Sequence, residues 1–367
     1  MQLLEKMTAP PFQNQAVVKP VRLAIVGSGN IASTHAAAIA AIPEARLTAV
    51  CSRNAESARR IANPPGARVF RSLDELLAAE LADAFLIATP SGVHAESVLP
   101  ILRAGRHVLC EKPFEIHTSR VAEMISEATR HNGILAGFFP LRFGRGAEAI
   151  RRALAHERFG RLTFLSARIK WWREQTYYAS SSWRGTWEMD GGGALINQGI
   201  HAVDLLQWFG GTVSEVTAYA ATLAHPEIEV EDTLAACLRF SHGCLGTIEA
   251  ATSCHPGLDL SVEISGTKGT AVLVNDRIDF WKFQDELPED ESVRGNAFSG
   301  AIKGGSSSPL AITSEGHRRQ IKAFCQAVLG DKQASLIEAG EAARAIAIVE
   351  AIYTSTRTGM PEKVSYL

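Results

Sequence analysis

The feature that most constrains the fold is the stretch from Val21 to His35, VRLAIVGSGNIASTH. It begins as a short apolar run of β-forming residues, passes through a turn marked by two glycines, and continues with apolar residues at helical spacing. This order predicts a strand, a tight turn and a helix. Gly27 can take the backbone angles of the turn, and Gly29 lets the backbone approach a pyrophosphate that lies on the exposed N–H groups of the helix.

Gly27, Gly29 and Ala32 form the pattern Gly-x-Gly-x-x-Ala, a permitted variant of the dinucleotide-binding fingerprint. Many glycine turns between a strand and a helix bind nothing, so the pattern gains its weight from its place after the first strong strand of a long alternating sequence. We therefore expect a nucleotide site. Its first contacts are expected from Gly27, Ser28, Gly29, Asn30 and Ile31.

Segments of strand and helix character alternate from this turn onward. Further strands are expected at 46–51, 68–70, 83–88, 107–110 and 134–138, with helices near 29–41, 73–79, 91–104 and 118–131. Six strands separated by helices are typical of a doubly wound parallel sheet, that is, an α/β Rossmann domain. Such sheets bind ligands at the carboxyl ends of their strands.

Beyond about residue 155 the pattern changes to neighbouring strands with few helices. Strands are expected at 162–172, 213–223, 233–240, 244–252, 258–265, 270–274 and 277–283, one helix at 192–208, a long loop at 285–310, and two amphipathic helices within 313–358. Runs of strands imply a large, open, mostly antiparallel sheet and an α+β second domain.

The chain has 367 residues, more than one core usually organises. We expect an N-terminal arm at 1–20, a dinucleotide-binding Rossmann domain at 21–150, and a substrate-binding and oligomerisation domain at 151–367, whose helices at 313–358 can pack back on the first domain. An open sheet with one face uncovered by helices needs a partner, so we expect a homodimer or homotetramer.

Composition excludes several classes of function. The formal charge is −2 and basic residues are scattered, which is unlike a nucleic-acid binder. Apolar runs are too short for a membrane span and the N-terminus lacks a signal-peptide pattern, so we expect a cytoplasmic protein. The six cysteines form no CxxC pair, which fits reduced thiols. Cys244, Cys254 and His255 match no known metal-site spacing, and we expect no metal.

The second expected strand is followed by Ser52, Arg53 and Asn54, where the fingerprint usually places an acid on the adenosine ribose. An acidic residue would repel a 2′-phosphate, whereas Ser and Arg would bind one, and this modestly favours NADP over NAD. In the alternative, Arg53 stacks over the adenine of NAD and decides nothing.

The fifth expected strand ends in Glu111-Lys112-Pro113. A lysine at this edge, beside a nicotinamide, can be partly desolvated. Its ammonium can then hydrogen-bond a substrate hydroxyl and stabilise the developing alkoxide. The alternative is a solvent-exposed lysine in a turn.

Residues 191–201, GGGALINQGIH, combine four glycines with Asn197 and His201. Each glycine costs about 1 kcal/mol relative to alanine within a helix, so the pattern indicates that another group approaches closely. Asn197 and His201 lie one turn apart on one face, with Asp204 a further turn along. His201 suits a general base because the ordinary pKa of imidazole lies near neutrality. The alternative is a buried core histidine.

Together the fingerprint, Thr89-Pro90 with His94, Glu111-Lys112-Pro113 and Gly199-Ile200-His201 resemble the glucose-fructose oxidoreductase / inositol dehydrogenase (Gfo/Idh/MocA) family from about Val21 to the C-terminus. The resemblance implies an NAD(P)-dependent dehydrogenase that acts on a secondary alcohol of a sugar or cyclitol, with Lys112 and His201 as its catalytic residues. The further cofactor contacts expected on this basis are Ser52, Arg53, Thr89, Pro90, His94, Glu111 and Lys112.

One departure from the family pattern matters. Many members carry Asp four residues before the histidine, where this chain has Asn197, so acid/base work falls on His201 and Lys112 and Asn197 is limited to hydrogen bonding. Asn197 and the string 182–185, Ser-Trp-Arg-Gly, are similar to the branch that oxidises the 3-hydroxyl of UDP-N-acetylglucosamine-type sugars. The expected substrate contacts are Arg142, Trp172, Arg173, Trp183, Arg184, Asn197 and His201; alternation should bury either Trp171 or Trp172.

Two other functions stay open. An NAD-dependent glycosidase or lyase that uses transient oxidation at carbon 3 would show no net change in cofactor absorbance. A non-catalytic dinucleotide-binding regulator would need neither Lys112 nor His201, and the presence of both argues against it.

Overall fold

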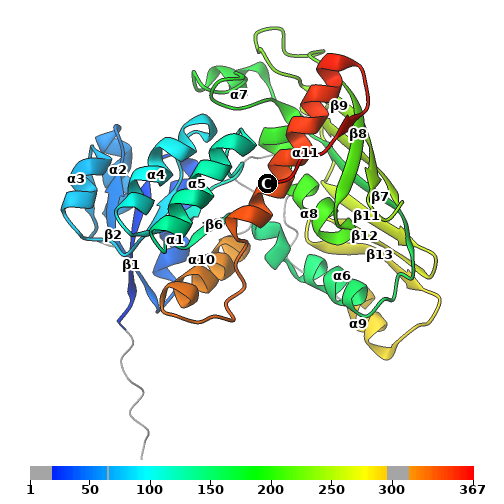
Figure 1. Ribbon diagram of the computed structural model, residues 1–367, viewed down its shortest axis with the longest axis horizontal. Coiled ribbons are helices and arrows are strands. Elements are labelled where there is room, and N and C mark those ends of the chain that lie inside the picture. The colour runs from blue at the N-terminus through cyan, green and yellow to red at the C-terminus, as the bar shows by residue number, and fades with distance from the viewer. Residues whose placement is uncertain (1–18, 64–65, 296–313) are drawn as a thin grey trace, which may run out of the picture.

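The computed structural model describes residues 19–63, 66–295 and 314–367. Figure 1 shows two sheets, each with its own helices, joined along a layer of helices between them. Most of the N-terminal arm expected at 1–20 and part of the loop expected at 285–310 lie outside the described residues.

The first sheet is fully parallel and has the order β3-β2-β1-β4-β5-β6. Its strands are β1 (Val21–Val26), β2 (Ala45–Cys51), β3 (Arg68–Phe70), β4 (Ala84–Ile87), β5 (His107–Cys110) and β6 (Leu135–Gly137). Its helices are α1 (Asn30–Ala40), α2 (Ala55–Ala62), α3 (Leu73–Ala78), α4 (His94–Arg103) and α5 (Thr118–Arg130), with short 3₁₀ turns η1 (Ser91–Val93) and η2 (Pro140–Phe143). The doubly wound Rossmann fold expected from the alternation is confirmed, and the strand order reverses between β1 and β4.

The central strands of this sheet are apolar along their whole length. In β4 all four residues are buried, and in β1 five of six are. Helices on both faces of a parallel sheet leave no side of a strand in water, so the sequence shows continuous apolar runs in place of alternation. Helix α2 is not among the expected ones. It has only eight residues, and of these Ala58, Ile61 and Ala62 are buried.

The second sheet has eight strands in the order β13-β12-β11-β7-β10-β9-β8-β14. They are β7 (Leu162–Lys170), β8 (Val213–Ala221), β9 (Thr233–Phe240), β10 (Leu245–Ala251), β11 (Ser261–Gly266), β12 (Gly269–Val274), β13 (Arg277–Phe283) and β14 (Glu362–Lys363). Every neighbouring pair is antiparallel except β7 and β10, which run parallel. The mostly antiparallel second domain is therefore confirmed.

Helices cover one face of this sheet among the described residues (Figure 1). The helices after β6 are α6 (Arg145–Ala155), α7 (Gln175–Ala179), the π-helix η3 (Ala194–Gly199), α8 (Ile200–Gly210), α9 (Pro288–Gly295), α10 (Ser314–Val328) and α11 (Ala339–Thr358). Residues of α6, α8 and α11 pack against the strands, and β9 alternates buried and exposed side chains accordingly. The opposite face exposes Phe164, Leu245 and Phe280.

The chain returns to the first sheet after β13. Helix α10 packs against α1, and the backbone N–H of Gly137 in β6 donates to the carbonyl of Ile337. A β-bridge between Ala136 and Glu338 continues this pairing. Helix α11 then packs against both α5 and β8, so the C-terminal helices join the two sheets. Among the helices of the described ranges, none combines the length and apolarity needed to cross a bilayer.

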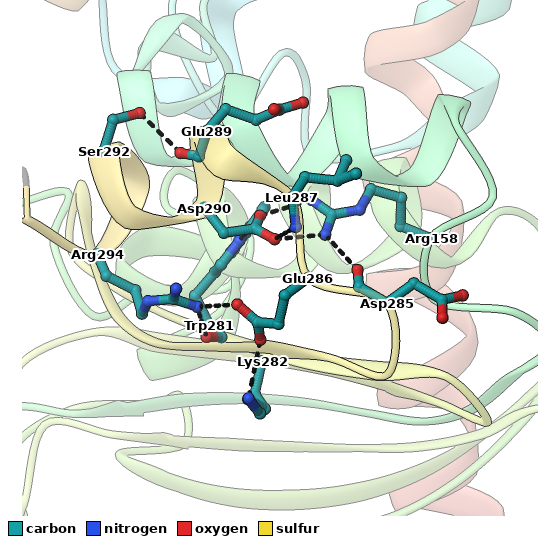
Figure 2. A network of polar contacts seen from close by, with 10 residues as sticks. All are labelled: Arg158, Trp281, Lys282, Asp285, Glu286, Leu287, Glu289, Asp290, Ser292 and Arg294. Carbon is teal, nitrogen blue, oxygen red and sulfur yellow. Dashed lines mark hydrogen bonds and ion pairs between the residues drawn. The ribbon is translucent and has the colours of Figure 1, made fainter.

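An ion pair between Arg158 and Asp290 holds α9 against the edge strand β13 (Figure 2). The fully buried carboxylate of Asp290 accepts two hydrogen bonds from Arg158, at 2.6 Å each, and one from the indole N–H of Trp281 at 2.6 Å. The backbone N–H of Leu287 adds a fourth. Hydrogen bonding to Arg158 holds the pKa of Asp290 well below its ordinary range. The polar sequence of α9 has little apolar face of its own, so this contact determines where the helix lies.

Replacing Asp290 by asparagine should lower the free energy of unfolding by about 2 to 4 kcal/mol, because the buried guanidinium of Arg158 loses its counter-charge. The folded pKa of Asp290 is depressed, so its contribution is present above the unfolded pKa of about 4 and is lost as the pH falls below that value. Urea unfolding at pH 7 and pH 3 measures both effects. Asp285→Asn, at an exposed carboxyl, is the control; equal stability of the two variants at pH 7 contradicts the assignment.

Candidate active site

The glycine turn after β1 is shaped by two different constraints. Gly27 has φ +109°, and a Cβ there would overlap the carbonyl of Ala88 at the end of β4. Only glycine fits this close approach. Gly29 is the N-cap of α1 with no side-chain cap, and a Cβ there would meet nothing within 4 Å. The first turn of α1 therefore faces open space, as a site for a pyrophosphate requires.

A cleft of about 680 Å³ runs from this turn to the second sheet. Both domains contribute to it. From the first domain come Gly27, Ser28, Gly29, Asn30, Ile31, Ser52, Arg53, Asn54, Arg71, Thr89, Pro90, Glu111 and Lys112, and from the remainder of the chain come Trp171, Arg173, Tyr177, Trp183, Arg184, Asn197, Gln198, His201 and His317. With one exception, His94, every expected cofactor residue lines this cleft.

The end of the cleft beside β2 and β3 is cationic. The hydroxyls of Ser28 and Ser52 lie 2.7 Å apart, and Arg53 and Arg71 follow the ends of the two strands. Sequence reasoning missed Arg71. The pairing of β2 with β3 provides the signal, because the carboxyl ends of adjacent parallel strands meet at one edge of the sheet.

Glu111 is a buried carboxylate that lies next to two imidazoles. Its Oε1 lies 2.9 Å from Nε2 of His35 and 3.8 Å from Nε2 of His317, and its Oε2 accepts the backbone N–H of Lys112 at 2.9 Å. Burial opposes ionisation of Glu111, but the contact with His35 outweighs it and lowers the pKa to about 2. The Glu111 carboxylate next to Lys112 is therefore negatively charged at physiological pH. Neither histidine is among the expected site residues.

Lys112 spans the two domains. Its Nζ donates to the backbone carbonyl of Asn197 at 2.8 Å. Burial lowers the pKa of the ammonium, and the charges of Glu111 and Asp190 partly offset this effect. The solvent-exposed alternative for Lys112 is therefore wrong, because the amino group is directed into the cleft and away from bulk water.

His201 lies in the first turn of α8 and is buried. Its ring meets Phe139 edge-on, with 6.1 Å between ring centroids, and its Nδ1 has no hydrogen-bond partner within the described ranges. Burial and the charge of Lys112 lower the pKa of His201 to about 3. The imidazole is therefore neutral at physiological pH and can accept a hydrogen bond from a bound ligand.

Asn197 is held by its neighbours. Its side-chain amide donates to Asp190, and its Oδ1 accepts from Gln198 at 2.8 Å. Asp190 in turn accepts the backbone N–H of Gly185 at 3.0 Å. The side chain thus ties η3 to the loop that carries Trp183 and Arg184, as expected for a residue limited to hydrogen bonding.

Aromatic and cationic side chains form the wall opposite the glycine turn. The guanidinium of Arg173 lies over Trp171 and Tyr177, at 5.0 and 5.4 Å from the ring centroids, and donates to Gln198 at 3.2 Å. Arg184 lies over Tyr177 and Trp183, at 4.4 and 4.8 Å. Burial lowers the pKa of Arg173. This wall suits a planar or ring-shaped ligand that carries negative charge.

Three expected site residues, Trp172, His94 and Arg142, do not line the cleft. Trp172 packs against His225 and His255, and Trp171 takes the position facing the cleft. His94 lies behind the cleft, with Nε2 at 3.0 Å from the carbonyl of Thr89.

Arg142 is buried in an ion pair with Asp204 at 2.6 Å and also contacts Glu341. It joins η2, α8 and α11, and both of its carboxylate partners lie outside the cleft lining. The carboxylate of Asp204 is therefore engaged by Arg142.

The glycines at 191–193 are explained by protein contacts. A Cβ at Gly193 would overlap the carbonyl of Glu231, and one at Gly192 would overlap the hydroxyl of Tyr353. The close approach that the glycine pattern predicts is real, but the approaching groups belong to this chain and not to a ligand.

Comparisons with known proteins agree with this geometry. The profile of the family described as "Oxidoreductase family, NAD-binding Rossmann fold" matches residues 21–138, and that of the "GFO/IDH/MocA C-terminal domain" matches residues 147–272. The chain is 27% identical to the myo-inositol 2-dehydrogenase of Thermotoga maritima over 256 residues, which are 68% of this chain and 74% of the relative.

Two solved structures resemble the whole chain. The WlbA dehydrogenase from Bordetella pertussis, in complex with NADH and UDP-GlcNAcA, is 34% identical with a TM-score of 0.87, covering 95% of this chain and 99% of that one. The WlbA dehydrogenase from Chromobacterium violaceum, with the same two ligands, is 30% identical with a TM-score of 0.85, covering 98% and 99%.

Substitution of the two turn glycines should separate folding from dinucleotide binding. Gly29→Ala has room in the unliganded protein, so we expect unchanged thermal stability but affinity for NAD weakened by about tenfold or more, because the methyl group enters the pyrophosphate space. Gly27→Ala should instead destabilise the fold itself. Thermal melts and calorimetric titration with NAD measure the two effects; undiminished NAD binding by Gly29→Ala contradicts the assignment.

Proposed function

The chain belongs to the Gfo/Idh/MocA family of NAD-binding oxidoreductases and is an enzyme of the dehydrogenase type, and on that premise we propose that it oxidises the 3-hydroxyl of an anionic nucleotide sugar. The observation that carries the proposal is one cleft that holds the desolvated ammonium of Lys112, the neutral imidazole of His201 and the uncapped start of α1.

The residues present fit a dinucleotide. The space above Gly29 accommodates a pyrophosphate, and the buried hydroxyl of Thr89, which has no partner among the described residues, faces the same cleft. When bound, the nicotinamide supplies the hydride acceptor. The turn and the start of α1 would hold the phosphates of the dinucleotide, and the walls of the cleft would exclude water from the reacting centre.

Lys112 and His201 both act on the substrate hydroxyl, in different roles. The Lys112 ammonium hydrogen-bonds the hydroxyl oxygen and stabilises negative charge that develops there. The neutral imidazole of His201 accepts the hydroxyl proton. Burial and the charge of Lys112 lower the pKa of His201 to about 3, so the imidazolium readily releases this proton again. In the direction of reduction the same groups act in reverse.

The substrate class is supported by the wall of the cleft. Arg173 and Arg184 stack on aromatic rings and face the space next to Lys112, and among the described lining residues the only carboxylate is the paired Glu111. Such a surface favours a sugar ring that carries a carboxylate. The two similar structures named above contain UDP-GlcNAcA, which has this character.

The finer cofactor proposal is that NADP is accepted and modestly preferred. The similar structures contain NADH. Here the pair Arg53 and Arg71 offers two guanidinium groups at the ribose end of the cleft, next to Ser52, where a 2′-phosphate would lie.

An absorbance assay of the reduced cofactor tests the function. We expect UDP-GlcNAcA to be oxidised with NAD or NADP, and UDP-GlcNAc and myo-inositol to react more slowly, because they lack a carboxylate for the arginine wall. Lys112→Ala should lower kcat by about a hundredfold or more with cofactor binding retained. Lys282→Ala, at an exposed lysine, is the control.

Undiminished turnover by Lys112→Ala removes this residue from the mechanism. Consumption of the sugar without net change in absorbance favours the transient-oxidation alternative, and cofactor binding without any turnover favours the regulator.

We propose that the exposed face of the second sheet joins copies of the chain into a dimer or tetramer. Leu245 and Phe164 are paired in register on adjacent strands, and both side chains point away from the helices. Apolar residues gathered on an uncovered sheet face typically mark a protein interface.

Light scattering of the 39.5 kDa chain should give two or four times the monomer mass. Phe164→Glu with Leu245→Glu should yield monomers, since charges would be buried in the interface. Leu329→Glu, at an exposed position after α10, should leave the mass unchanged. A monomeric parent chain at micromolar concentration refutes the interface.

A further inference from the structure

The helical segment that carries Asn197 and His201 begins against a single residue, Glu231. The backbone N–H groups of Gly193 and Leu195 donate to its two carboxylate oxygens, at 2.9 Å each. The N–H of Ala194 donates to its backbone carbonyl at 3.0 Å. Glu231 therefore accepts hydrogen bonds from three consecutive N–H groups at the start of the helical segment. Such groups otherwise lack partners within a helix.

The glycine run makes this contact possible. Gly193 leaves room for the Glu231 carbonyl, and Gly192, at φ +147°, leaves room for the hydroxyl of Tyr353. Each glycine lowers helix stability by about 1 kcal/mol relative to alanine. The two glycines therefore reduce local helix stability, but they let the Glu231 carbonyl and the Tyr353 hydroxyl approach the backbone.

Tyr353 completes the arrangement from α11. Its hydroxyl donates to Oε1 of Glu231 at 3.0 Å, and its ring meets Trp187 edge-on at 5.2 Å between centroids. Glu231 is 4% exposed, so its carboxyl group depends on these protein donors and not on water. It connects the start of β9, the start of η3 and the middle of α11.

The segment held in this way carries the cleft chemistry. The π-helix η3 contains Asn197, whose carbonyl accepts the Lys112 ammonium at 2.8 Å, and α8 follows with His201 in its first turn. Wide π-helical turns are frequent at functional sites and need support from their surroundings. A shift at 193–195 is therefore transmitted directly to the acceptor of Lys112 and to His201.

We propose that Glu231, supported by Tyr353, is a positioning residue that fixes the catalytic segment 194–201 relative to Lys112, and that loss of its negative charge loosens that segment. The catalytic part of this inference rests on the proposed function. The positioning itself does not.

Burial raises the pKa of Glu231 to about 7, against the lowering effect of its hydrogen bonds. The titratable group that faces it is Tyr353, whose own pKa burial raises far above the ordinary value, so the phenol stays neutral. The neighbouring Asp232 is turned away, toward the N–H groups of Leu223 and Ala224 and the ring of His225. A protonated Glu231 carries a hydrogen on one oxygen and loses the negative charge that strengthens both contacts with Gly193 and Leu195. The cap therefore weakens as the pH falls through neutrality.

Steady-state kinetics of the full chain test the inference. We expect the kcat of the parent chain to decline below pH 7. For Glu231→Gln we expect kcat about tenfold lower or more, an unchanged dissociation constant for NAD, and loss of that decline. Tyr353→Phe should lower kcat severalfold and move this decline to higher pH, because one donor that lowers the pKa of Glu231 is removed. Glu289→Gln and Tyr219→Phe, both at exposed residues, are matched controls.

Amide NMR signals of Gly193 and Leu195 in the parent chain give a readout that needs neither turnover nor a stable variant. Both should titrate with one shared midpoint near pH 7, and the signal of an exposed loop residue should not. Absence of this shared titration, or a Glu231→Gln variant with parental kcat and pH profile, overturns the inference. A shared titration in a protein that oxidises none of the sugars supports the positioning and refutes only the proposed function.

Discussion

The hydrogen bond from the Lys112 ammonium to the Asn197 carbonyl is the contact on which the cleft depends. It joins the carboxyl end of β5 to the helical segment on the second sheet, and both partners are partly buried. Burying an ammonium is costly unless charge and hydrogen bonds compensate. Here the compensation comes from Glu111 behind the lysine and from Asp190 beside it. The position of Lys112 is thus an electrostatic consequence of both domains and not a property of its own strand.

The elements that complete this arrangement come late in the chain. Helix α10 brings His317 to within 3.8 Å of Glu111, and α11 supplies Glu341 to Arg142 and Tyr353 to Glu231. The C-terminal helices therefore hold both the carboxylate behind Lys112 and the segment before His201. This explains why α10 and α11, which lie more than two hundred residues after Lys112 in sequence, carry the buried polar residues His317 and Tyr353 and the partly exposed Glu341 at these contacts.

Much of the fold could be predicted from the sequence because its signals are local. Strand–helix alternation predicts the parallel sheet, and the glycine turn, Lys112 and His201 occur in short recognisable patterns. The residues that escaped prediction act through neighbours distant in sequence. Glu231 and Arg71 have no local pattern that separates them from surface charges. Helices α2 and α9 have small apolar faces and are placed by tertiary contacts, such as the pairing of Arg158 with Asp290 in α9.

The expected site residues that lie outside the cleft lining have the same physical origin. Trp171 and Trp172 carry the same chemistry, and only the register of the strand end decides which one faces the cleft. Arg142 follows the sixth strand at an edge where ligand-binding cations are common. In the structure Arg142 instead forms ion pairs with Asp204 and Glu341. Both carboxylates come from helices distant in sequence, so the pattern around Arg142 does not predict them.

The two carboxylates that support the catalytic groups are equally buried but behave differently. Among the described residues, Glu111 faces the imidazoles of His35 and His317 and has a pKa of about 2, whereas Glu231 faces amides and a phenol and has a pKa of about 7. Burial raises the pKa of both carboxyl groups. The contacts with the two histidines outweigh burial at Glu111, and the hydrogen bonds at Glu231 do not. The charge behind Lys112 is therefore constant across physiological pH, while the support of the His201 segment varies with it. Glu231 is therefore expected to contribute a pH dependence near neutrality from the helical side of the cleft, where the pKa of His201 lies far below this range.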